Sequence, residues 1–425
     1  MKRSLKCTIP LIVILLLLIP NILPISAYTE QEIKTSEFEE KKELYLMRSE
    51  HYLHINATED VDEFNLRFVF PPDYQYQVPI YLEIHTDTTA EISNYKIQDD
   101  KNEPNKVINF TINSVEKYEN IMIHFSCWVF VQNHEFDDLP KKVKFPKKSN
   151  LPQDTKTWLK SSSVVQKNRL LIKLRARQLK GLSDNLIRFA GRVAKFIKNH
   201  RFGLFLIQLS LRIFFSQDAF TTLLINGENV GRAHLACAFF RGFNVPARVL
   251  LVHNDQGFWT QMHFMVEYYC PGYGWVLIDP TFGKTPYSTK KQIINRICFP
   301  EDEEDTKRDY VYSTMRGEER WIWIDNEYIK PVYIDCNEGS KSQMFYEGNI
   351  EIDEFTADYA FLQAHLVYYQ YEKYLGKDLS VHNQEYFQNA LEYQTSALQE
   401  FLQSDIQAYI ENMYLAYQEY LKIDE

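Results

Sequence analysis

The stretch that decides the fold runs from Asn226-Gly-Glu-Asn-Val-Gly-Arg-Ala-His-Leu235 to His263-Phe-Met-Val-Glu-Tyr-Tyr-Cys-Pro-Gly-Tyr-Gly-Trp-Val-Leu-Ile-Asp279. Its first part continues into the apolar run 236–244, which predicts a buried helix. A strand should begin after Pro246, and two further strands should flank the Pro-Gly-Tyr-Gly turn at 271–274. The pattern therefore predicts a helix followed by three strands.

The two strands around the turn carry a polar residue at each open end. His263 opens the first strand, and Asp279 closes the second. Residues at these positions on antiparallel strands joined by a tight turn can face each other, so we expect an imidazole–carboxylate hydrogen bond. Such a pair serves either proton transfer or structure alone, and the second interpretation is slightly favoured.

The stretch resembles the core of the transglutaminase-like superfamily, which has a papain-like arrangement of Cys, His and Asp. In that family a Gly-x-Cys begins the helix, an Ala-x-Leu lies on it, and an Arg precedes a Pro-Ala-Arg turn. A His then opens one strand and an Asp-Pro closes another. Residues at the family's spacing here are Gly227, Ala233, Leu235, Arg241, Pro246, Ala247, Arg248, His263 and Asp279.

The nucleophile position of that pattern departs from the family, because Asn229 stands where the resemblance implies cysteine. A thiolate attacks an amide carbonyl while a neighbouring imidazole accepts its proton, and a carboxamide cannot replace it. Asn is a good N-cap residue, so we expect Asn229 to cap the helix rather than to react. Cys237 lies about 12 Å further along the helix axis, given a rise of 1.5 Å per residue, and is expected to be a core thiol. Cys270 is expected to lie too far from His263 to substitute.

Length, charge and cysteine usage limit the remaining possibilities. The chain has 425 residues and a net charge of −10, which argues against a general nucleic-acid binder. Six cysteines, without a Cys-x-x-Cys spacing, indicate neither a disulfide framework nor a zinc site. The acidic run 301–305 lacks the oxygen spacing of a calcium loop and is expected to be a solvated loop. We expect no cofactor and no metal.

The N-terminus has the features of a secretory signal over residues 1–27. Lys2, Arg3 and Lys6 precede an apolar run, and Ile25-Ser-Ala27 fits a cleavage site. The alternative is an uncleaved membrane anchor formed by residues 8–25. Both predict a secreted or cell-envelope protein.

The flanking segments predict an α+β fold of several parts. Residues 28–55 are rich in Glu and Lys and are expected to form a polar helix or stalk. Alternating runs at 64–70, 79–85 and 121–131 predict a β-sandwich-like accessory domain within 28–150. A papain-like transglutaminase core is expected at 151–350, and a helical extension at 351–425.

Three details of these flanks are open to test. The basic stretch 156–212 has helical spacing, and its basic face is either solvated, which we favour, or docks an acidic partner. The alternating runs 320–325 and 328–333 are expected to form a hairpin added to the core sheet. Three helices are expected after Asp353, with breaks near Gly376 and Ser404.

The function that follows from the resemblance depends on Asn229, His263 and Asp279. We expect a transglutaminase-like protein at the cell surface that binds protein or peptide and is catalytically inactive. One alternative is an active cysteine-type amidase, protease or transglutaminase with another nucleophile. A second is a structural component of the cell envelope. The ligand and the oligomeric state are not given by the sequence.

Overall fold

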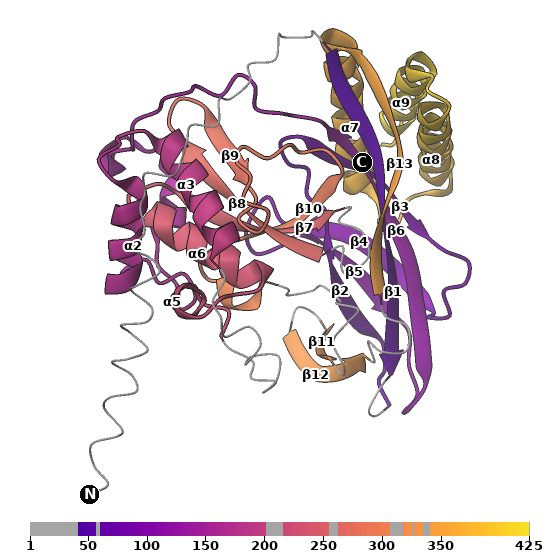
Figure 1. The fold of residues 1–425 in the computed structure, drawn as a ribbon. Helices are drawn as coiled ribbons and strands as arrows, with labels where there is room; N and C mark the ends of the chain where they lie inside the picture. Colours follow the sequence, from indigo (N-terminus) through magenta and orange to yellow (C-terminus); the bar gives the residue numbers. More distant parts are fainter. Residues whose placement is uncertain are drawn as a thin grey trace, which may run out of the picture.

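The computed structural model describes residues 41–56, 60–200, 216–254, 262–306, 318–324, 327–334 and 341–424. Figure 1 shows a small sheet with helices on one side, a large sheet beside it, and further helices at the C-terminal end. The predicted α+β class is confirmed. Residues 1–40, which include the predicted signal segment, lie outside the described residues, as does the basic stretch beyond residue 200. No helix in the described ranges is long and apolar enough to cross a bilayer.

The small sheet has four antiparallel strands in the order β10-β7-β8-β9. Helix α6 packs against β8, against α5 and against β7, and three other helices precede it. The helices are α2 (Leu170–Lys180), α3 (Leu186–Asn199), α5 (Ala219–Leu224) and α6 (Asn229–Arg241). The strands are β7 (Ala247–Asn254), β8 (Met262–Cys270), β9 (Gly274–Ile278) and β10 (Gln292–Cys298).

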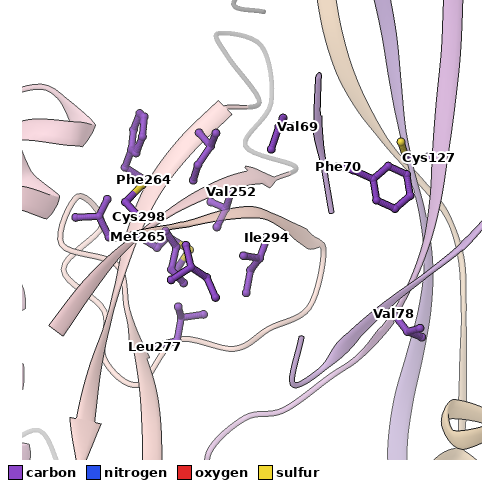
Figure 2. Packing of buried hydrophobic residues seen from close by; sticks show 14 of the residues in the cluster. Val69, Phe70, Val78, Cys127, Val252, Phe264, Met265, Leu277, Ile294 and Cys298 are labelled. Atoms are coloured by element: carbon purple, nitrogen blue, oxygen red, sulfur yellow. The ribbon is translucent and has the colours of Figure 1, made fainter. Parts of the chain in front are cut away.

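Both faces of the small sheet are covered. Every residue of β7 and β10 is buried, polar residues such as Arg248 and Arg296 included, so burial does not alternate along these strands as it does in a half-exposed sheet. Figure 2 shows Val252, Met265 and Ile294 of this sheet beside the large sheet, which contributes Phe70 and Cys127. The two sheets therefore share one hydrophobic core.

The large sheet has nine strands in the order β3-β6-β1-β12-β11-β2-β5-β4, and β13 pairs with β1 beside this path. Phe125 of β6 nevertheless contacts Phe68 of β2 and Phe110 of β5, each with ring centroids 5.2 Å apart. Because β6 and β2 are not neighbours in the sheet, the sheet must fold over itself. The packing is thus sandwich-like, as predicted. The strands before the core are β1 (Lys41–Asn56), β2 (Phe64–Phe70), β3 (Gln77–Ile84), β4 (Ile92–Asp99), β5 (Lys106–Ile112) and β6 (Asn120–Gln132).

The prediction of a polar helix or stalk at 28–55 is wrong for residues 41–55, which form β1. The strand pairs with β6 on one side and with β13 on the other, and Leu44, Leu46 and Leu53 are fully buried. Hydrogen bonds to two neighbours therefore outweigh the helix-favouring Glu and Lys residues.

The hairpin predicted after residue 318 exists, but it joins the large sheet instead of the core sheet. It consists of β11 (Glu318–Ile324) and β12 (Glu327–Ile334). β11 pairs with β2 at Asn65, and β12 pairs with β1 at Asn56. β13 (Lys341–Asp353) then runs along β1. The chain thus returns to the large sheet after building the core.

The three predicted C-terminal helices are confirmed as α7 (Glu354–Tyr374), α8 (Val381–Leu402) and α9 (Ile406–Tyr420). The side chains of Asp353, Ser380 and Asp405 cap their first turns. Gly376 and Ser404 adopt positive φ at the two breaks. Phe130 of the large sheet packs on Phe401 and Tyr409, so these helices cover one end of the sheet.

Two side-chain amides join the core to the large sheet. The Gln77 amide donates to the Ile294 carbonyl at 2.8 Å and accepts from the Ile294 N–H at 2.7 Å. Asn105 makes the same two bonds with Ile297, at 2.8 and 2.7 Å. Arg296 reaches across to Asp100 at 2.7 Å. These contacts fix β10 against the large sheet.

The prediction of a solvated loop at 301–305 is wrong for Asp302 and Glu303, both of which are buried. Glu303 forms an ion pair with Arg241, and neither side chain is exposed. Arg241 also donates to the Ala247 and Lys160 carbonyls. A buried guanidinium needs such partners, and the acidic run supplies one of them.

We expect Glu303→Gln to lower the free energy of unfolding by about 3 kcal/mol, because it leaves the Arg241 cation buried without its counter-ion. Chemical denaturation measures this loss. The matched control is Glu304→Gln, since Glu304 is the exposed neighbour and should change stability by less than about 0.5 kcal/mol. Equal losses in the two variants would contradict the assignment.

Candidate functional site

His263 and Asp279 lie together at the end of the small sheet. His263 is near the start of β8, and Asp279 follows β9 directly. Their side chains are buried, and the His263 Nε2 and Asp279 Oδ2 atoms are 3.0 Å apart. The hydrogen bond predicted from the two strands is therefore present.

The other oxygen of Asp279 fixes the turn that follows. Its Oδ1 accepts the N–H of Thr281 at 2.8 Å and that of Phe282 at 2.9 Å. Such a turn is typical of Asp, whose short side chain reaches backbone groups two and three residues on. One carboxylate thus orients the imidazole and also the chain at residues 281–282.

Asn229 is the first residue of α6, and the prediction that it caps this helix is wrong. The N-cap residue is Glu228, whose side chain makes no capping bond. The Gln217 Oε1 atom instead accepts the Glu228 N–H at 2.9 Å. A side chain from before α5 therefore accepts one of the free N–H groups at this terminus.

The Asn229 carboxamide meets the turn held by Asp279. Thr281 Oγ1 donates to Asn229 Oδ1 over 3.4 Å, the long limit of a hydrogen bond. The structure thus brings the start of α6 and the end of β9 together. All three residues predicted from the sequence, Asn229, His263 and Asp279, gather around this turn.

Gly227 is required by the close packing of α5 on the start of α6. A Cβ atom there would lie 2.5 Å from Thr222 Oγ1 and 2.7 Å from its Cγ2. A Cβ atom at Gly231 would likewise lie 2.5 Å from Thr222 Oγ1 and 2.7 Å from Gln217 Oε1. Because any larger side chain would push α5 away, both glycines help to place Asn229.

The imidazole of His263 is held in an orientation that suits proton transfer. Its Nε2 faces the Asp279 carboxylate, which favours the tautomer with hydrogen on Nε2. No described residue is hydrogen-bonded to Nδ1, so that atom can accept a proton from a group in the site. Phe282 lies beside the ring with centroids 5.6 Å apart and is 39% exposed. The site therefore combines a basic nitrogen with an accessible aromatic side chain.

The described thiols are buried away from any such role. Cys237 is a fully buried core residue, as predicted, and burial raises the pKa of its thiol. Cys270 is buried at the end of β8, and burial raises its pKa to about 11. Thiolate formation is suppressed at both positions. Cys7 and Cys336 lie outside the described residues.

Arg248 is the structural ion-pair partner that the sequence predicted. It donates to Glu267 at 2.8 Å, and Tyr74 donates to the same oxygen at 2.9 Å. Its guanidinium lies 3.7 Å from the centroid of the Trp275 ring. Trp275 therefore has the packing role expected of it.

Sequence reasoning missed the contributions of Gln217, Thr281 and Phe282. Gln217 has no local signal, because the N–H group that it accepts belongs to Glu228, 11 residues later. Thr281 and Phe282 could have been found, since an Asp followed by Pro-Thr-Phe is typical of a side-chain-capped turn. In the described part of the chain, no group of three or more His, Cys, Asp or Glu side chains could hold a metal ion.

Comparison with known proteins identifies a family model for this core. Residues 176–280 match the model of the transglutaminase-like superfamily. A putative cysteine protease from Cytophaga hutchinsonii aligns over 69% of this chain and all of its own, with 12% identity and a TM-score of 0.45. A putative protease from Parabacteroides distasonis covers 54% of this chain and 42% of its own, with 13% identity and a TM-score of 0.22. No curated protein matches the chain.

The buried His234 of α6 should make stability depend on pH. Burial lowers its pKa, although its Nδ1 is 2.7 Å from the Gln217 carbonyl oxygen. The ordinary pKa is about 6.5, so below that pH the unfolded chain binds a proton that the folded chain does not. The free energy of unfolding must then fall as the pH falls.

We expect His234→Gln to be less stable than the parent at pH 7.5 but to lose less stability between pH 7.5 and 5.5, by at most about 1.4 kcal/mol, the limit set by the ordinary pKa of the unfolded chain. Urea denaturation at several pH values measures both effects. The control is His382→Gln, whose side chain is 70% exposed and which should follow the parent's pH profile. A parallel profile for His234→Gln would show that this residue does not titrate on unfolding.

Proposed function

Residues 176–280 form a transglutaminase-like core, and we propose that this chain is a secreted or cell-surface protein whose site binds protein or peptide without cleaving it. The observation that carries the proposal is the position of Asn229. It stands at the start of α6 and contacts Thr281, whose N–H is bound by Asp279, the partner of His263.

The chemistry of the carboxamide supports an inactive site. Acyl transfer needs a nucleophile that bonds to carbon, and in this fold a helix N-terminus favours its negative charge. The nitrogen lone pair of Asn229 is delocalised into its carbonyl and does not form an acyl intermediate. Proton transfer by His263 would then have no attacking group to activate.

The same groups support binding of an extended peptide. Asn229 offers an amide donor and a carbonyl acceptor, and Nδ1 of His263 offers a second acceptor. Phe282 adds an accessible apolar surface beside them. A peptide presents the complementary set of N–H groups, carbonyls and apolar side chains. The basic start and apolar run of residues 1–27 support export of the chain.

The preserved histidine geometry favours one second candidate, an active cysteine-type amidase, protease or transamidase. The Asp279-oriented imidazole with an available Nδ1 is what a general base requires. This candidate needs a thiol within reach of His263, supplied by residues other than those described.

We expect Asn229→Cys to restore a reactive thiolate, because the helix terminus and the His263–Asp279 pair are in place. Iodoacetamide should alkylate this cysteine at least 100-fold faster than the one in Asn229→Cys/His263→Ala, which keeps the thiol but loses the base. Peptide mass spectrometry after brief labelling measures both rates. Equal alkylation rates would mean that His263 does not activate a thiol at position 229.

The parent chain provides the test against the active-enzyme candidate. With a fluorogenic glutamine-containing peptide, its turnover should equal that of His263→Ala. Rapid labelling of any native cysteine, Cys336 included, together with His263-dependent turnover would overturn the inactive-site proposal. A photoreactive amino acid at position 282 tests binding, and it should capture peptide that an excess of free peptide displaces.

A further inference from the structure

Helix α7 is apolar on two opposite sides. One side is buried against the large sheet and α9, through Ala357, Phe361, Ala364, Tyr368 and Tyr371. The other side carries four exposed residues, with exposed fractions of 80% for Phe355, 41% for Tyr359, 51% for Leu362 and 68% for Tyr369, and the partly exposed Leu366. We call these five residues the outer stripe.

The outer stripe follows a single line along the helix. Its members are spaced by four, three, four and three residues, which is the spacing of one helical face. A face of this kind is normally polar when it meets water, and contiguous exposed apolar surface marks a contact site. Four of its five residues are exposed in the structure. The stripe is therefore a surface that another molecule is suited to cover.

The stripe has an aromatic residue at each end and a leucine at its centre. Leu362 stands at the centre, Tyr359 and Leu366 flank it, and the rings of Phe355 and Tyr369 stand at the two ends. A two-fold axis through Leu362 would place each member against its counterpart in an antiparallel copy. Such self-complementarity is the requirement of an isologous dimer contact.

The charges at the two ends of α7 are complementary in the same antiparallel arrangement. Glu354 and Asp358, at the N-terminal end, have side chains 61% and 54% exposed and share the cation of Lys42. Lys373 lies four residues beyond Tyr369 at the other end. With a rise of 1.5 Å per residue, Lys373 of one copy would lie within about 5 Å, along the axis, of Glu354 in the other.

We propose that the outer stripe binds a second copy of this chain, with the two α7 helices antiparallel about a two-fold axis near Leu362. The stripe extends about 21 Å, and a stable interface buries about 800 Å² on each partner. A contact built on one helix falls below that area. The dimer is therefore reversible and depends on protein concentration.

A single cysteine at the centre of the stripe tests the axis directly. In Leu362→Cys of the full chain, a short bismaleimide should join two copies, because both cysteines face the same axis. The matched control is Val381→Cys, a residue of α8 that is 86% exposed and should yield no covalent dimer. Equal cross-linking of the two variants, or none in Leu362→Cys, would overturn the proposal.

Charge reversal tests the orientation of the helices. Lys373→Glu and Glu354→Lys should each weaken self-association at least tenfold in sedimentation equilibrium, because like charges then meet at both ends. Mixing the two variants should restore association. In the mixed dimer the two introduced side chains, which are opposite in charge, meet at one end, and the parent pair remains at the other. Without rescue in the mixture, the antiparallel arrangement is wrong.

The stripe could instead meet a lipid surface, and the experiment separates that outcome. Leu362→Glu should abolish the dimer, whereas Val381→Glu should not, and unchanged circular dichroism would show that both variants fold. If the parent is monomeric at all concentrations and floats with phosphatidylcholine vesicles in a Leu362-dependent manner, a membrane and not a second copy covers α7.

Discussion

The carboxylate of Asp279 is the constraint on which the site depends. One oxygen binds the His263 imidazole, and the other binds two backbone N–H groups of the following turn. A fully buried carboxylate is stable only when such donors surround it, so the pair and the turn must form together. Because the turn also delivers Thr281 to Asn229, one side chain couples the end of β9 to the start of α6.

The large sheet holds the small sheet, and with it the site, in position. Its strands come from both sides of the core in sequence, so the core is inserted between β6 and β11. The side-chain amides of Gln77 and Asn105 bond to the backbone of β10 as the peptide groups of a neighbouring strand would. These bonds attach the small sheet to the large sheet, although the two sheets share no strand pairing. The position of β8 and β9, and hence of the His263–Asp279 pair, follows from these backbone-level contacts.

Local spacing was enough to predict the parts of the fold that depend on neighbouring residues. The apolar run after Asn229 predicted α6, the Pro-Gly-Tyr-Gly turn predicted β8 and β9, and the breaks at Gly376 and Ser404 divided the last three helices. The failures all involve distant partners. We predicted a helix or stalk for residues 41–55 because their composition gives no sign of the pairing with β13, which lies about 300 residues later in the chain. We predicted a solvated position for Glu303 because its ion-pair partner, Arg241, is 62 residues away in the sequence.

The difference between local spacing and distant partners also applies to Asn229. Its sequence position suggested a helix cap, a role that stabilises the fold and needs no ligand. Glu228 is the N-cap residue instead, and Gln217 accepts its N–H. What remains is its contact with Thr281 beside the His263–Asp279 pair. The carboxamide there is neutral, and it presents a hydrogen-bond donor and an acceptor. A hydrogen-bonding group at the position where the sequence resemblance implied a cysteine is the physical basis for the proposal of a site that binds.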